Sequence, residues 1–101
     1  MRSQIIPDMQ AIRSFCDSNE IEEMALFGSV TRQDFSPTSD VGVLIRFSPQ
    51  KRPTLFDICR IESELEDFFQ GRRIDLHTIK EIHPKLQPKI LAEREILYGS
   101  A

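Results

Sequence analysis

The sequence lacks the long apolar run of a membrane-spanning helix, since no uninterrupted stretch approaches about 18 apolar residues. It also shows no basic-then-apolar leader, no repeat and no low-complexity segment. We therefore expect a cytoplasmic protein that is neither secreted nor inserted in a membrane. Because 101 residues are too few to bury two independent cores, we expect a single domain over residues 1–101.

Cysteine is scarce, and an excess of positive charge is missing. Cys16 and Cys59 each fall on an apolar stripe with helical spacing, so we predict reduced thiols in the core rather than a disulfide. The 13 Lys and Arg residues against 16 Asp and Glu residues give a net charge of -3. Proteins that bind nucleic acid neutralise its phosphates with an excess of Lys and Arg, which this sequence lacks, so no direct nucleic-acid binding is expected.

Apolar spacing predicts a mixed α/β domain whose three- to four-stranded sheet is covered by helices. Thr54 and Asp57 form a capping-box pattern at the start of the clearest helix. The run from Asp40 to Phe47 is rich in branched residues and predicts the clearest strand. In chain order we expect a helix over 9–16, a strand over 24–27, a helical turn and loop over 30–39, a strand over 40–47, a helix over 54–71, a strand over 73–79 and a helix over 88–97.

Gly28 and Ser29 lie between a predicted strand and a predicted helical turn, where backbone amides and the helix dipole favour a phosphate. Alone, this turn is weak evidence for a phosphate site. Ten residues after Ser29, Asp40 opens the next strand. In the strand over 73–79, Asp75 and His77 share the face opposite Ile74.

This spacing of Gly-Ser and Asp resembles the signature of minimal nucleotidyltransferases in the DNA polymerase β superfamily. The likeness extends from about Phe15 to Gly99 and includes the stretches 26–32, 39–40, 43–45, 73–76 and 90–99 together with Asp34 and Pro37. The resemblance implies a nucleotidyltransferase fold that uses Mg²⁺ and ATP. It implies Asp40 and Asp75 as catalytic carboxylates and metal ligands, and Gly28, Ser29 and Arg32 as the nucleotide-binding residues.

The sequence departs from this family at Gly42, where a second carboxylate usually follows Asp40 by two residues. Gln33, where relatives commonly have glycine, is a lesser departure. A glycine inside a strand packs nothing, which indicates either a lost carboxylate or a close approach by another group. We expect two-metal binding to suffer most, with a slower transfer. The sequence leaves open whether Gly42 is natural or introduced.

Several polar residues near these motifs have a plain structural interpretation. His77 is within reach of a metal role beside Asp75, but a partly exposed strand histidine is the simpler interpretation because magnesium prefers oxygen. Similarly, His83 lies in a proline-flanked turn and is expected to be structural or solvated. Arg46, Lys51 and Arg52 are expected to form a solvated rim.

Minimal nucleotidyltransferases of this size resemble the antitoxins of toxin-antitoxin systems whose partner is a HEPN ribonuclease. The resemblance implies a protein adenylyltransferase that moves AMP from ATP onto a tyrosine of that toxin. The alternative from another class is a catalytically silent protein that neutralises or scaffolds a partner by binding. A third hypothesis is transfer to a hydroxyl of a small molecule or nucleic acid.

Overall fold

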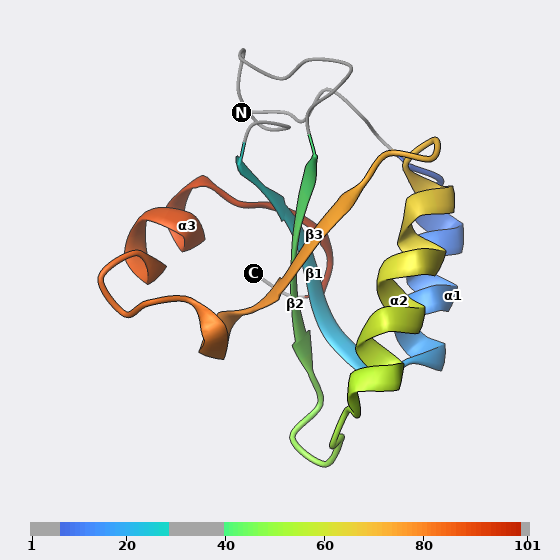
Figure 1. Cartoon of the computed structure of the whole chain (residues 1–101), viewed down its shortest axis with the longest axis horizontal. Coiled ribbons are helices and arrows are strands. Elements are labelled where there is room, and N and C mark those ends of the chain that lie inside the picture. The colour runs from blue at the N-terminus through green and yellow to red at the C-terminus, as the bar shows by residue number, and fades with distance from the viewer. Residues whose placement is uncertain (1–6, 29–39, 100–101) are drawn as a thin grey trace.

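The computed structural model describes residues 7–28 and 40–99 of the chain. The elements are α1 (Met9–Ser18), β1 (Ile21–Phe27), β2 (Val41–Phe47), α2 (Leu55–Phe68), β3 (Ile74–Thr78), the 3-10 helix η2 (Ile79–Glu81), α3 (Gln87–Glu93) and β4 (Glu95–Tyr98). Figure 1 shows α1 and α2 on one side of the sheet and α3 on the other. The predicted turn over 30–39 lies outside the described residues.

The strands form one mixed sheet of four strands in the order β3-β2-β1-β4. β1 pairs antiparallel with both β2 and β4, whereas β2 and β3 are parallel. Parallel neighbours need a crossover connection, which α2 supplies between β2 and β3. The predicted mixed α/β class with a helix-covered sheet is confirmed.

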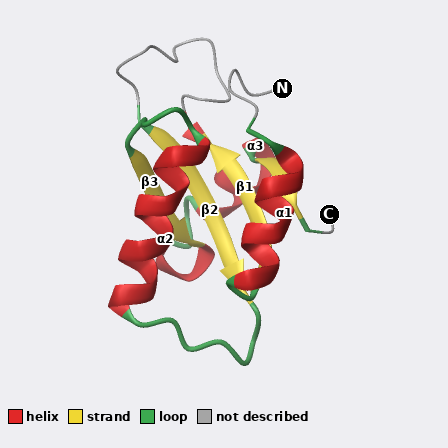
Figure 2. Cartoon of the chain, turned by 90° about the vertical axis from the view of Figure 1, so that its right-hand side faces the viewer, coloured by secondary structure: helices red, strands yellow, loops and turns green. Residues whose placement is uncertain are grey.

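The core lies between the sheet and the pair α1 and α2, which lie side by side over one face (Figure 2). Phe69, just beyond α2, is fully buried, whereas Phe68 is half-buried and packs edge-on against Phe15 with ring centroids 5.4 Å apart. The fully or nearly fully buried cluster consists of Ile12, Cys16, Ile21, Met24, Leu26, Val41, Val43, Ile45, Ile61, Leu65, Phe69 and Ile74.

Local hydrogen bonds set the starts of the two covering helices. Asp8 caps α1 by accepting hydrogen bonds from the backbone N–H groups of Gln10 and Ala11. At α2 the predicted capping box is present: Thr54 Oγ1 accepts from the Asp57 N–H at 3.1 Å, and the Asp57 carboxylate accepts from the Thr54 N–H at 2.8 Å. No helix among the described residues has the length and apolarity that a bilayer crossing requires.

The end of the chain differs from the predicted helix over 88–97. α3 ends at Glu93, Arg94 is extended with ψ 147°, and the next four residues form β4. Ile96 pairs with Ala25 and Glu95 with Leu26, so β4 supplies partners to the backbone of β1. Arg94 Nε also donates to Glu23 Oε2 at 3.0 Å. The helix prediction was confirmed up to Glu93 and wrong beyond it, because pairing with a strand 70 residues away outweighs local spacing.

The position of Cys59 corrects the prediction that both thiols lie in the core. Cys16 is buried as expected, but Cys59 is exposed, and both thiols are free. Since successive helical residues turn by about 100°, Cys59 lies roughly 200° from buried Ile61 and faces away from the core. β1 also begins earlier than predicted, at Ile21 rather than Met24.

Candidate active site

Three strand ends bring the predicted carboxylates and Gly28 to one end of the sheet. β1 finishes there at Phe27, and β2 and β3 begin there at Val41 and Ile74. Phe27 is opposite Gly42 in the antiparallel pair, and Gly42 is opposite Asp75 in the parallel pair. Because residues opposite one another project from the same face, Phe27, Gly42 and Asp75 share the face that α1 and α2 leave uncovered.

Asp40 is exposed and immediately precedes β2. The Val41 N–H donates to the Arg73 carbonyl at 2.9 Å, so regular pairing with β3 starts directly after Asp40. Strand alternation puts Asp40 on the face of Gly42 and therefore of Asp75. Two residues along one strand and one strand across correspond to roughly 8 Å between the two Cα atoms. Both carboxylates can thus reach the space in front of Gly42.

Asp75 is held by His77 on the same strand face. Its side chain is 55% exposed, and His77 Nε2 lies 2.9 Å from Asp75 Oδ1. An ionised carboxylate only accepts hydrogen bonds, so Nε2 carries the proton in this contact. The imidazole packs edge-on against the Phe27 ring, with centroids 5.9 Å apart. His77 therefore orients Asp75, and its Nε2 is already engaged.

Gly42 is buried because β1 lies too close for a side chain. A Cβ built on Gly42 would lie 2.5 Å from the Phe27 carbonyl oxygen and 3.3 Å from Phe27 Cδ1. No ordinary Cβ contact is as short as the first of these, so a residue with a side chain requires the backbone of Phe27 to move. Phe27 is the site residue that the sequence analysis missed, since only strand register reveals what faces Gly42.

Gly28 has the backbone conformation that its predicted role needs. Its φ is +82°, in the left-handed region that favours glycine, and among the described residues, apart from its chain neighbours, no atom lies within 4 Å of an added Cβ. The other two predicted nucleotide-binding residues, Ser29 and Arg32, lie outside the described residues.

His83 lies apart from this site and, as expected, has a structural contact, with its Nδ1 accepting from the Lys85 N–H.

The donor set fits one magnesium ion better than two. Exposed carboxylate oxygens from Asp40 and Asp75 are the hard ligands that Mg²⁺ takes, commonly one or two of them together with phosphate and water. A second ion would need a further carboxylate in front of β2, where Gly42 supplies none. Within residues 7–28 and 40–99, no group of three His, Cys, Asp or Glu side chains is arranged to hold a metal.

Known proteins are similar to this chain in sequence. The polymerase beta nucleotidyltransferase family matches residues 10–101. A candidate protein adenylyltransferase of Methanocaldococcus jannaschii, MJ0435, is 36% identical over 73 residues, covering 72% of this chain and 75% of that protein. A second from the same organism, MJ1379, is 28% identical over 82 residues, covering 81% and 80%.

Solved structures show the same fold. A candidate minimal nucleotidyltransferase has a TM-score of 0.70 and 29% identity, with 85% of each chain covered. A toxin-antitoxin crystal structure with AMP-PNP has a TM-score of 0.71 at 15% identity, covering 92% of this chain and 74% of that one. A mutant MntA-HpeT toxin-antitoxin gives a TM-score of 0.70, also at 15% identity with the same coverage. On the family match and the identity to MJ0435, the chain belongs to the polymerase beta nucleotidyltransferase family.

Proposed function

We propose that this chain transfers AMP from ATP to a tyrosine hydroxyl of a HEPN ribonuclease toxin, with release of pyrophosphate, and thereby acts as its antitoxin. The sheet geometry carries the proposal, because the register pairs Asp75 with Gly42 and strand alternation gives exposed Asp40 the same face, at the sheet end where Gly28 lies. Relatives named as candidate protein adenylyltransferases support the reaction, and fold neighbours from toxin-antitoxin complexes support the setting.

Each residue has a distinct role in this proposal. The turn that begins at Gly28, with Ser29 and Arg32, binds the triphosphate through backbone amides, a hydroxyl and a cation. Asp40 and Asp75 would hold Mg²⁺, which as a Lewis acid would neutralise charge on the phosphate oxygens. Asp75 lies on the acceptor side and takes the proton of the attacking hydroxyl. His77 keeps the Asp75 carboxylate turned toward that side through its 2.9 Å contact.

Gly42 lowers the expected rate without removing the site. A carboxylate there would bridge two metal ions, whereas Asp40 and Asp75 alone suit one. The barrier to transfer is then higher by several kcal/mol, and each ~1.4 kcal/mol is a tenfold loss of rate. We expect weak, magnesium-dependent ATP binding and slow transfer.

The second candidate function is partner neutralisation by binding alone. The packing at Gly42 favours it, since the Phe27 carbonyl oxygen occupies the place that a side chain at position 42 would need. In this alternative the chain retains the fold and covers the toxin without modifying it. The two candidates differ in whether the partner gains mass.

The test is to incubate the purified chain with a co-expressed HEPN toxin, labelled ATP and magnesium, and to measure the intact mass of the toxin. We expect a gain of one AMP that is lost in Asp40→Asn and in Asp75→Asn. Asp67→Asn is the matched control, because Asp67 is exposed on α2, the helix that covers the opposite face of the sheet. It should modify the toxin as the parent does.

Two outcomes contradict the adenylyltransferase proposal. AMP transfer that persists in both Asp40→Asn and Asp75→Asn would show that other groups perform the chemistry. A toxin inhibited by the parent and by Asp75→Asn equally, with no gain in mass, would support neutralisation by binding. ATP binding in the presence of magnesium, followed by calorimetry, separates a silent nucleotide site from no site.

A further inference from the structure

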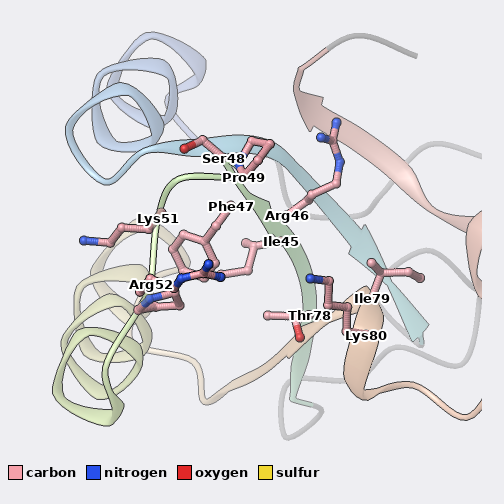
Figure 3. A pocket seen from close by; sticks show the side chains of 11 residues that line it. Ile45, Arg46, Phe47, Ser48, Pro49, Lys51, Arg52, Thr78, Ile79 and Lys80 are labelled. Atoms are coloured by element: carbon pink, nitrogen blue, oxygen red, sulfur yellow. The ribbon is translucent and has the colours of Figure 1, made fainter.

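A cavity lies at the other end of the sheet from Gly28 and Asp40. It has a volume of about 370 Å³ and lies where β2 ends, between the loop that follows β2 and the start of η2. Since β2 has seven residues at about 3.3 Å each, its two ends lie roughly 20 Å apart, and the nearest lining residue, Ile45, is roughly 10 Å along the strand from Gly42. Its lining is Ile45, Arg46, Phe47, Ser48, Pro49, Lys51, Arg52, Pro53, Thr78, Ile79 and Lys80 (Figure 3).

The floor of this cavity is apolar. Ile45 is 1% exposed, and Phe47 and Ile79 are half-buried beside it. Pro49 and Pro53 complete the apolar lining and restrict the backbone of the loop. Such a concave apolar surface of a few hundred Å³, with a small number of polar groups, is typical of small-molecule sites.

The cations around the cavity fall into two pairs. Arg46 forms ion pairs with Glu22 and Glu23. In the same way, Lys51 Nζ lies 3.7 Å from a Glu20 oxygen and 3.9 Å from an Asp57 oxygen. Carboxylates of the chain therefore already compensate these two cations.

Arg52 and Lys80 form the other pair, and no carboxylate within the described part of the chain pairs with them. Figure 3 shows the Arg52 guanidinium and the Lys80 ammonium turned toward the middle of the cavity from opposite sides, with Ile45 and Thr78 between them. The Thr78 hydroxyl donates to Glu81 Oε1 at 3.0 Å, so Glu81 is engaged there rather than by Lys80. Two uncompensated cations thus converge on an apolar floor in a chain whose net charge is -3.

We propose that this cavity binds a small organic dianion, with a flat apolar group on the Ile45 and Phe47 floor and a phosphate-like head between Arg52 and Lys80. A dianion relieves the repulsion between the two cations, and a guanidinium matches a phosphate with two parallel hydrogen bonds. The apolar floor removes the flat group of the ligand from water. This site is independent of the proposed transfer reaction and does not share its residues.

The test uses 1-naphthyl phosphate, which combines a flat apolar ring system with a dianionic head. The chain has no tryptophan, so the naphthyl fluorescence is read without that background. Titration should show saturable binding, and amide NMR shifts should fall on Ile45, Phe47 and Ile79 rather than on Gly28 or Asp75. Inorganic phosphate and 1-naphthol, which carry only the charge or only the ring, should each bind at least tenfold more weakly.

Variants identify the cations that matter. Arg52→Ala and Lys80→Ala should each weaken 1-naphthyl phosphate about five- to tenfold, which corresponds to one charge-assisted contact. Lys89→Ala, at an exposed lysine outside the cavity, is the matched control and should leave binding unchanged. 1-Naphthoate, with a single charge, should bind more weakly than the phosphate ester.

Three results would overturn the proposal. Equal binding of 1-naphthol and 1-naphthyl phosphate would show that the cations play no part. Shifts confined to Gly28 and Asp75 would place the anion at the other end of the sheet. Tighter binding of a Glu- and Phe-containing peptide at the same amides would make the cavity a docking point for an acidic protein segment instead.

Discussion

At Gly42 two strands approach closely, and the missing side chain has a steric cause as well as a chemical effect. The Phe27 carbonyl oxygen lies 2.5 Å from where a Cβ would be. An aspartate at position 42 would therefore add a carboxylate and displace the end of β1 in the same change. Restored chemistry and lost stability are expected together.

Gly42→Ala isolates the steric part of this effect. We expect a loss of about 1–3 kcal/mol in unfolding free energy, since overpacking forces the backbone of Phe27 to move. Urea denaturation measures it. Asp75→Ala is the control on the neighbouring strand, where trimming an exposed side chain should change stability by no more than about 0.5 kcal/mol. Replacing glycine at an unhindered site stabilises a protein. If Gly42→Ala were more stable than the parent, the end of β1 would move at no cost and the steric explanation would be wrong.

The two thiols should differ sharply in reactivity. Burial, together with the nearby charge of Asp17, raises the pKa of Cys16 to about 12, whereas Cys59 is exposed. Because the thiolate is the reactive form, iodoacetamide at pH about 8 should modify only Cys59 in the folded chain. Intact mass should show one adduct when folded, two in denaturant and none in folded Cys59→Ser. An adduct on Cys16 of the folded chain would contradict the burial of this thiol on the core side of α1.

Among the elements, α2 has a start whose stability depends on pH. The Thr54 N–H, followed by the Thr54 hydroxyl, Lys51 and Arg60, lowers the pKa of Asp57 below its ordinary 3.8. The folded state thus favours the ionised carboxylate, and this stabilisation is present above the unfolded pKa and lost as pH falls through the folded one.

Thr54→Ala removes one hydrogen bond of the capping box and should cost about 1 kcal/mol at neutral pH. Asp57→Asn should also destabilise at neutral pH, and its difference from the parent should shrink as pH falls below about 4. Thermal melts at several pH values measure both. A parent-to-Asn difference that stays constant with pH would mean that the Asp57 charge does not stabilise α2.

The elements also show which structure local patterns predict. The capping box, the helical stripes and the strand that follows Asp40 rest on neighbours a few residues apart, and these predictions were confirmed. β4 depends on pairing with β1 and on the Tyr98 hydroxyl, which donates to Asp17 Oδ1 at 2.5 Å. Such long-range contacts leave no pattern within the segment itself. The apolar spacing over 88–97 was that of a helix, so the strand could not be predicted from it.

The candidate site divides in the same way. Alternation placed Asp75 and His77 on one strand face, and their 2.9 Å contact agrees with it. Register alone reveals that Phe27 faces Gly42 and that its ring packs against His77. Likewise, the pairing of Arg46 and Lys51 with carboxylates, which leaves Arg52 and Lys80 uncompensated, arises from the folded arrangement and not from spacing.

In the molecule as a whole, β2 connects two sites of opposite charge. The exposed carboxylates of Asp40 and Asp75 lie at its amino end and the cationic cavity lies at its carboxyl end, so the two sites are at opposite ends of one strand. Both sites bind phosphate in our proposals, but by different chemistry. One requires a divalent cation between carboxylates and phosphate, whereas the other requires only fixed cations.

This separation predicts that each site loses its own ligand without affecting the other. Asp75→Asn should weaken ATP binding in the presence of magnesium and leave 1-naphthyl phosphate unchanged, while Lys80→Ala should do the reverse. Because about 20 Å separates the two ends, the coupling free energy from the double variant should stay below about 0.5 kcal/mol. Calorimetric titration of all four proteins with both ligands measures it. A coupling above about 1 kcal/mol would instead mean that β2 transmits occupancy from one end to the other, since no side chain is shared between the two sites.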